Sequence, residues 1–205
     1  MVIRCVWEHN GEDTLLYSDN FPGAYTRGET KEIAMQKMEG ELISFLRWAR
    51  AAIPTEWEVE IVQEKESSLQ ISDADSDVLF DSEKRPLCQE DYLFLKEITL
   101  KSAADFQKLY DAIPDKNKSV LQKRKTFYGL TPATAQEMYD HTKGVNSYYF
   151  EEIGVDADHE GSILECRKRG FALLEKTEGY LDNPDFHGSY GEDWTLLKLF
   201  RRFLW

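Results

Sequence analysis

The sequence has no long apolar run, and it has few cysteines and few histidines. Its longest uninterrupted apolar stretches cover only a few residues, whereas a helix that crosses a bilayer needs ~20. The first residues, MVIRCVWEHNG, alternate in the manner of a strand and lack the basic region and apolar core of a signal peptide. The three cysteines (Cys5, Cys88 and Cys166) are widely spaced and odd in number, which favours reduced thiols over a disulfide framework. We therefore expect a cytoplasmic protein that does not associate with membranes.

Positive charge is also scarce. The 205 residues include 25 Lys and Arg against 38 Asp and Glu, which gives a formal net charge of -13. A chain this acidic is repelled by phosphate backbones, so we expect no nucleic-acid partner, and a basic protein or a small ligand fits better. One stretch before Phe127 is locally basic, and we interpret it as a solvated loop. Its cations are Lys116, Lys118, Lys123, Arg124 and Lys125.

The common short motifs of catalysis and nucleotide binding are missing. The sequence contains no HExxH, CxxC, GxGxxG, GxxxxGK[ST] or GxSxG. Their absence argues against the metalloproteases, dithiol oxidoreductases, nucleotide-binding proteins and serine hydrolases that carry them. The chain is nevertheless long enough for one large domain or two small ones.

Residues 1–65 follow a strand pattern that gives way to a helix and then to a final strand. VIRCVWEH alternates, Asn10-Gly11 is a strong hairpin signal, and TLLYSD and the residues after Pro22-Gly23 form two further short strands. A helix begins near Glu29 or Thr30 and ends before Pro54, with an apolar stripe at Ala34, Met38, Leu42, Phe45, Ala49 and Ile53. EWEVEIV is a clean alternating strand. The predicted order is β-β-β-α-β.

Residues 66–86 are acidic and rich in Ser and Asp, so we predict a linker there. Residues 87–205 show four amphipathic helical patterns, which predict an up-and-down four-helix bundle and an α+β protein as a whole. The first pattern ends at Pro114, and the second has start signals at Thr131 and Pro132. The third covers residues 158–177. The fourth opens with a capping-box spacing between Ser189 and Glu192.

The fourth helix is predicted to be shorter than its partners. It runs to the end of the chain as DWTLLKLFRRFLW, without a C-capping residue, and covers roughly three turns at ~3.6 residues per turn. An unmatched helix would leave apolar surface of the longer helices bare. We therefore expect a truncated last helix whose second half lies beyond Trp205.

His141 is the histidine of most interest. It lies on the expected inward stripe of the second helix, which runs through Met138, Val145, Tyr148 and Glu152. A buried imidazole needs a partner for each ring nitrogen, which a metal or a tyrosine or backbone group can supply. His187, in the loop FHGSYGEDW, is interpreted as an exposed turn residue. The carboxylates Glu192 and Asp193 are interpreted as solvated charges at a helix end, and Cys166 as a packed thiol.

Two stretches, TPATAQEMYDHTKGVNSYYFEEIG and GSYGEDWTLLKLFRRFLW, make residues 86–205 resemble the DinB-like superfamily of four-helix bundles. The resemblance implies a divalent metal, Zn²⁺ or Ni²⁺, held by three histidines. One lies on the second helix, where His141 matches, and two lie on the last helix, beyond Trp205. The metal site would thus be incomplete in this chain. Tyr148 would be a hydrogen-bonding partner near the site, and His187 an alternative ligand.

The same family includes thiol-dependent S-transferases and a mycothiol-dependent isomerase. The resemblance therefore implies a metal-dependent transferase that uses a low-molecular-weight thiol. Residues 2–62 more weakly resemble the HicB-like antitoxin fold, through FPGAYTRGETKEIAMQKM, and that family pairs with small basic toxins. The alternative hypothesis is thus a non-catalytic interaction protein, in which this acidic module binds a basic partner and the bundle forms a homodimer.

Overall fold

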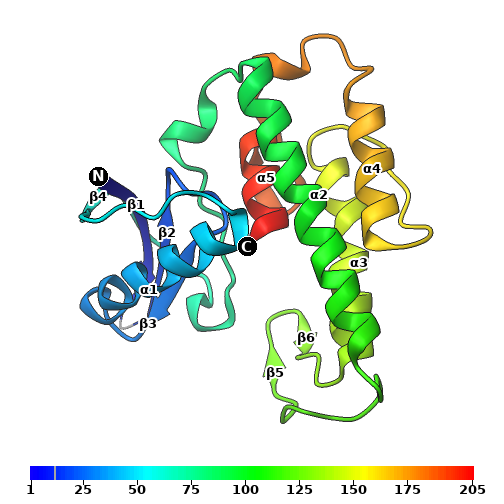
Figure 1. Ribbon diagram of the computed structural model, residues 1–205, viewed down its shortest axis with the longest axis horizontal. Coiled ribbons are helices and arrows are strands. Elements are labelled where there is room, and N and C mark those ends of the chain that lie inside the picture. Colours follow the sequence, from blue (N-terminus) through cyan, green and yellow to red (C-terminus); the bar gives the residue numbers. More distant parts are fainter. Residues whose placement is uncertain (12) are drawn as a thin grey trace. The chain divides into compact units, whose positions relative to one another are not determined.

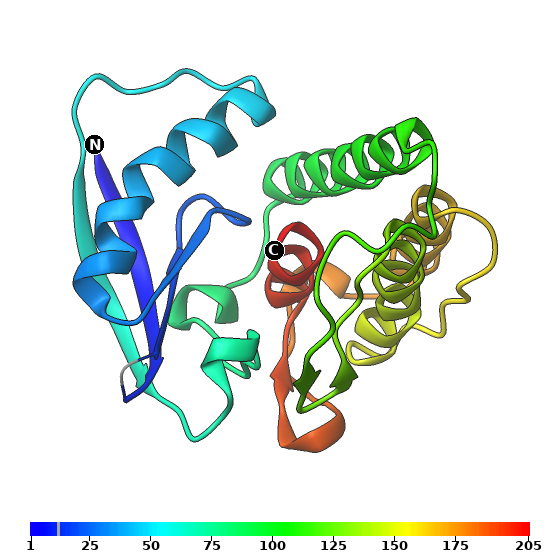
Figure 2. The ribbon, with the colours of Figure 1, turned by 90° about the horizontal axis from the view of Figure 1, so that it is seen from below.

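The computed structural model describes residues 1–11 and 13–205, and the chain divides into two compact units (Figures 1 and 2). The sheet unit comprises Met1–Glu83 together with Leu204–Trp205, and the helical unit comprises Lys84–Phe203. The predicted α+β class is confirmed, with an N-terminal sheet and five α-helices in the described residues. None of these helices is both long enough and apolar enough to cross a bilayer.

The sheet unit is built on four strands in the spatial order β3-β2-β1-β4. They are β1 (Val2–Asn10), β2 (Asp13–Ser18), β3 (Tyr25–Gly28) and β4 (Glu58–Glu66). β1 pairs antiparallel with β2 and parallel with β4, and β2 pairs antiparallel with β3. The parallel pair requires a crossover, which is provided by α1 (Lys31–Ala49). The predicted β-β-β-α-β order is therefore present.

One face of the sheet packs against α1. Ile3, Cys5 and Leu16 meet Ala34, Met38, Leu42 and Leu46 in a single buried cluster. The helix begins at Thr30, whose hydroxyl accepts a hydrogen bond from the backbone N–H of Ile33 at 3.3 Å. It ends earlier than predicted, before Ile53, because Arg50 adopts a left-handed conformation (φ 58°) and closes the last turn.

The other face is covered by the stretch that the sequence predicted to be a linker. Ile71, Val78 and Phe80 are buried against Val6, Leu15 and Tyr17. Polar contacts hold the same stretch, since Ser76 donates to the buried carboxylate of Glu8 and Gln63 Nε2 donates to the Leu79 carbonyl at 3.1 Å. Residues 67–83 are thus part of the sheet unit. The linker was inferred from the acidic composition, but three apolar residues in the segment are enough to hold it on the sheet.

The last residue of the chain also belongs to this unit. The Trp205 ring makes edge contacts with the rings of Tyr17 and Tyr25, at centroid distances of 5.6 and 5.8 Å. Such edge-to-face pairs add to the stabilisation that apolar burial already provides.

The helical unit contains four α-helices around a shared aromatic core (Figure 1). They are α2 (Gln89–Ala112), α3 (Ala135–Glu151), α4 (Ile163–Leu174) and α5 (Leu196–Leu204). Rings from all four helices touch one another, namely Tyr92, Phe150, Phe171, Phe200 and Phe203. Two short hairpins complete the unit, β5 (Lys125–Thr126) with β6 (Gly129–Leu130), and β7 (Phe186–His187) with β8 (Asp193–Trp194).

Three helix starts differ from the sequence prediction. α4 begins at Ile163, not near Asp158, because Ser162 and Glu165 form a capping box. α3 begins after Thr134, not Thr131, because Thr134 and Glu137 form a reciprocal capping box. α5 is capped by Thr195, whose hydroxyl accepts a hydrogen bond from the Lys198 N–H at 3.1 Å.

The predicted capping box at Ser189 and Glu192 is wrong. Ser189 donates its backbone N–H to the Glu152 carboxylate at 2.7 Å and lies in a separate 3₁₀ turn, Ser189–Gly191. Asp193 and Trp194, between that turn and α5, form β8.

The three cysteines differ in burial, and this difference predicts how fast each thiol is labelled. Cys88 is exposed, whereas Cys5 and Cys166 are buried, and burial raises the pKa of the Cys5 thiol to about 12. Because the thiolate is the reactive form, we expect iodoacetamide to modify Cys88 alone in the native protein and all three cysteines in guanidinium chloride. Mass spectrometry of timed samples provides the measurement. Fast native labelling of Cys5 would contradict the sheet packing described above.

Candidate functional site

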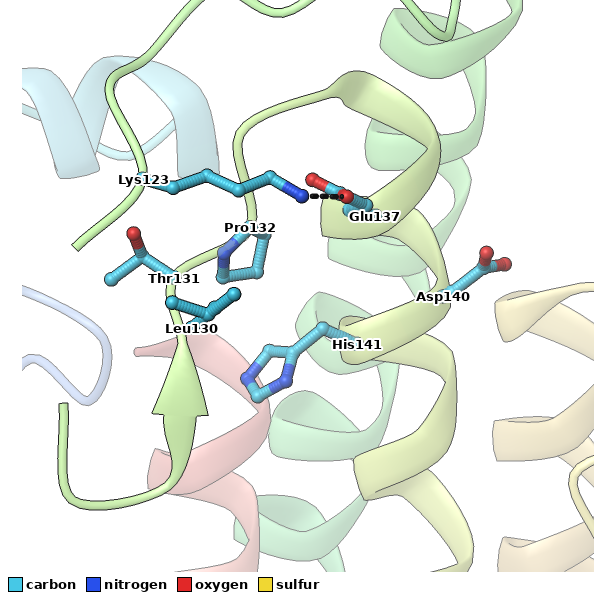
Figure 3. A pocket seen from close by; sticks show the side chains of 7 residues that line it. All are labelled: Lys123, Leu130, Thr131, Pro132, Glu137, Asp140 and His141. Carbon is cyan, nitrogen blue, oxygen red and sulfur yellow. Dashed lines mark hydrogen bonds and ion pairs between the residues drawn. The ribbon is translucent and has the colours of Figure 1, made fainter. Parts of the chain in front are cut away.

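His141 lines a hollow of about 320 Å³ in the helical unit (Figure 3). One wall is the start of α3, which contributes Glu137, Asp140 and His141 from successive turns. The other wall is formed by the end of β6 and the two residues after it, with Lys123 from the segment before β5. The complete lining is Lys123, Leu130, Thr131, Pro132, Glu137, Asp140 and His141. Glu137 and His141 are four apart on α3 and therefore share a face, whereas the Asp140 side chain is directed away from the His141 ring (Figure 3).

The charged groups at the rim of the hollow hold the chain in place. Lys123 Nζ lies 2.6 Å from Glu137 Oε1, as the dashed line in Figure 3 marks. The same carboxylate accepts the backbone N–H of Ala133 at 2.8 Å and that of Thr134 at 3.2 Å. These contacts lower the pKa of Glu137, and the hydrogen bond from Lys123 is the largest cause. The ion pair therefore fixes the loop against α3.

The His141 ring is exposed and points into the hollow beneath Leu130 and Pro132 (Figure 3). It stacks on the Tyr128 ring at a centroid distance of 5.7 Å. The sequence prediction of an inward-facing histidine is therefore wrong. A different face of α3 packs on the core and buries Tyr139, Asn146 and Phe150. Phe150 lies on this face because its ring packs against the rings of Phe171 and Phe203.

The three predicted site residues are not brought together. Tyr148 is seven residues beyond His141 on α3 and contacts the rings of Tyr149 and Trp194. His187, on β7, is highly exposed, and its Nδ1 lies 2.7 Å from the Asp193 carboxylate. Among the described residues, no hydrogen bond or ring contact joins any two of His141, Tyr148 and His187.

A metal centre would need more ligands than these residues provide. Within residues 1–11 and 13–205, no three His, Cys, Asp or Glu side chains form a group that could hold a metal ion. A zinc site normally takes three protein ligands and a water, or four protein ligands. The described side chains around His141 therefore do not fit a complete metal centre.

Sequence reasoning missed a buried ionic group beside Tyr148. The side chain of Lys198 is fully buried, and its Nζ lies 2.9 Å from Glu192 Oε1 and 2.6 Å from the Asp193 carbonyl. Burial lowers the pKa of Lys198 to about 8, and Glu192 opposes this shift. Arg202 also pairs with Glu192. The interpretation of Glu192 as a solvated helix-end charge is thus wrong, since its side chain is only 13% exposed.

Burial, and then the charges of Glu152 and Glu192, raise the pKa of Tyr148. A tyrosine is ordinarily protonated at neutral pH, and this upward shift keeps the Tyr148 hydroxyl a hydrogen-bond donor at higher pH as well.

A second buried cation lies in the core of the helical unit. Arg167 donates from Nε to Asn146 Oδ1 at 2.9 Å, and from Nη1 to the Thr99 carbonyl at 3.0 Å and to Ser102 Oγ at 2.7 Å. Its guanidinium also lies 4.4 Å from the centre of the Phe203 ring. Burial lowers the pKa of Arg167 to about 9. Because these partners come from α2, α3 and α5, Arg167 on α4 joins all four helices through one buried polar group.

Chemically, the hollow offers an accessible imidazole beside the Lys123–Glu137 ion pair, which suits a small polar ligand. Comparison of the chain with family models, with curated proteins and with solved structures gives no match. The resemblances stated above therefore rest on the sequence motifs alone.

Proposed function

We propose that the helical unit is DinB-like and supports a divalent-metal-dependent transfer of a thiol sulfur to an electrophile, with His141 as one metal ligand. The observation that supports this role is the position of His141, whose exposed ring on α3 faces a hollow large enough for a small molecule. A histidine held in the core by neighbouring side chains would be unavailable to a ligand, and His141 is not so held.

The proposal requires ligands other than those in the described residues. The family pattern places two further histidines after a tryptophan that corresponds to Trp205, four residues apart. Zn²⁺ and Ni²⁺ are the candidate metals, and a low-molecular-weight thiol is the candidate co-substrate. Tyr148 is the candidate hydrogen-bond donor near the site, and His187 the alternative ligand.

The activity can be tested on the protein expressed from its full coding sequence. An aryl chloride and a small thiol are supplied, so that a carbon–sulfur bond forms, the carbon–chlorine bond breaks, and chloride and the thiol proton are released. We expect turnover that depends on added Zn²⁺ or Ni²⁺, is lost in His141→Ala and persists in the control His159→Ala, whose side chain is exposed. Equal rates in His141→Ala and the unmodified protein would contradict the role of His141.

A second candidate function is protein binding by a HicB-like sheet unit. The observation that favours it is β4, which lies at the edge of the sheet and presents exposed carboxylates at Glu58, Glu60, Glu64 and Glu66. An edge strand can pair with an added strand, and these charges would select a basic one. Calorimetric titration with an extended Lys/Val peptide tests this candidate. Binding is expected to weaken in Glu60→Lys and to persist in the control Glu90→Lys, and an equal effect of both would contradict it.

A further inference from the structure

Exposed apolar side chains concentrate in one short stretch of the helical unit. Within eleven residues, five large apolar side chains are between 46% and 65% exposed, and we call them the hairpin surface: Val120, Leu121, Phe127, Tyr128 and Leu130. They lie on and beside the β5–β6 hairpin (Figure 1). Single exposed apolar residues are normal on a protein surface, but a cluster of this kind marks an interaction site.

The backbone that carries the hairpin surface is held by hydrogen bonds. Thr131 and Arg124 are joined twice, through Thr131 N to the Arg124 carbonyl at 2.9 Å and through Arg124 N to Thr131 Oγ1 at 3.1 Å. Val120 N donates to the Ala133 carbonyl at 2.9 Å, and Thr126 Oγ1 donates to the Gly129 carbonyl at 3.0 Å.

Gly129 completes the turn with a φ of +121°, a conformation that favours glycine. The Phe127 and Tyr128 rings at the tip touch each other, with centroids 4.9 Å apart. An ordered loop pays little entropy on binding, so the hairpin surface is preorganised for a partner.

The charge around the hairpin surface points to an acidic partner. Residues 115–132 contain five Lys and Arg and one acidic residue, Asp115. By contrast, residues 1–83 contain seven Lys and Arg against 18 Asp and Glu, a net charge of -11. One chain therefore carries both a basic apolar surface and a strongly acidic unit. Complementary potentials of this kind steer association and fix which surfaces meet.

A second copy of the chain is the occupant that this charge distribution favours. A bilayer or a nucleic acid would present negative charge alone to a protein whose net charge is -13. A second copy presents an acidic unit to each basic hairpin, so a two-fold arrangement satisfies both surfaces at once. We propose that the protein forms a homodimer in which the hairpin surface of each copy docks on the acidic sheet unit of the other.

The oligomeric state of the full chain tests this interface. We expect sedimentation equilibrium to show a dimer whose dissociation constant rises at least ~10-fold in Phe127→Ser/Leu130→Ser, because central apolar contacts dominate interface energy. The control is Tyr190→Ser, which removes an aromatic side chain that is 97% exposed and outside the hairpin surface. All the substituted side chains are largely exposed, and circular dichroism verifies that each variant is folded.

Charge-reversal variants test whether the basic residues of the hairpin contribute to dimerisation. Lys118→Glu/Lys125→Glu is expected to weaken the dimer, and Lys108→Glu, whose side chain is 77% exposed on α2, is expected to leave it unchanged. Raising the salt concentration should also weaken the dimer, since exposed charges are screened.

Three results would overturn the proposal. They are a monomer at every concentration up to about 100 µM, a dimer that Phe127→Ser/Leu130→Ser leaves intact, and a monomer that sediments with phosphatidylserine vesicles through Lys118 and Lys125. The last result would assign the hairpin surface to a membrane.

Discussion

Gly170→Ala is expected to destabilise the helical unit by about 3 kcal/mol, although alanine normally favours a helix over glycine. A Cβ at Gly170, in the middle of α4, would lie 2.2 Å from Cε2 of Phe150 and 2.5 Å from two other atoms of that ring. Phe150 is fully buried and packs on the rings of Phe171 and Phe203. Because the ring has no room to withdraw, α4 must shift away from α3.

Gly144→Ala provides the matched control for this prediction. Gly144 lies inside α3, and a Cβ there would meet nothing within 4 Å. Its replacement should follow helix propensity and stabilise the protein by about 0.5–1 kcal/mol. Urea unfolding followed by circular dichroism at the helix band measures both variants. The same sign of change in the two variants would contradict the close approach of α3 and α4.

Arg167→Ala is expected to cost about 4 kcal/mol, through a core cavity and through partners left without their hydrogen bonds. The carbonyl of Thr99 and the side chains of Asn146 and Ser102 would all lose the guanidinium, and Thr99 and Asn146 are fully buried. Arg167→Met should cost less, about 2 kcal/mol, since it keeps most of the side-chain volume and removes a charge that burial disfavours.

Arg169→Ala is the control, because it removes an arginine from the same helix at an exposed position. Arg169 pairs with Asp158 at the surface of the helical unit, and that pair is open to solvent. Exposed ion pairs contribute little to stability, so the unfolding midpoint should barely move. If Arg169→Ala lowered the midpoint as much as Arg167→Ala, the buried polar tie would not be the source of the effect.

Local patterns were sufficient to predict the strand and helix order of the sheet unit. Alternation in VIRCVWEH and EWEVEIV and the spacing of Ala34, Met38 and Leu42 each record a contact with one face of the sheet. Residues 67–83 escaped the same reasoning. Their fold depends on where Ile71, Val78 and Phe80 contact the opposite face of the sheet. The overall composition of the segment does not show the positions of these three residues.

The helical unit was harder to predict because its core is polar as well as aromatic. Arg167 reaches Thr99 across 68 positions, a partner that no local pattern can indicate. Start signals were also ambiguous, since Thr131 and Thr134 both precede α3 and only the reciprocal bonds to Glu137 decide between them.

His141 was singled out by its place on the expected inward stripe, and the family resemblance then made it a candidate metal ligand. The hollow beside it depends on the loop before α3, whose course the sequence did not predict.

The most direct test of the central proposal is the metal content of the protein expressed from its full coding sequence. Mass spectrometry for zinc and nickel should find about one ion per chain in the unmodified protein, and little in His141→Ala, because a site of three ligands rarely survives the loss of one. His159→Ala serves as the matched control and should keep its metal. Equal metal content in His141→Ala and the unmodified protein, or no metal in either, would contradict the assignment of His141 as a ligand.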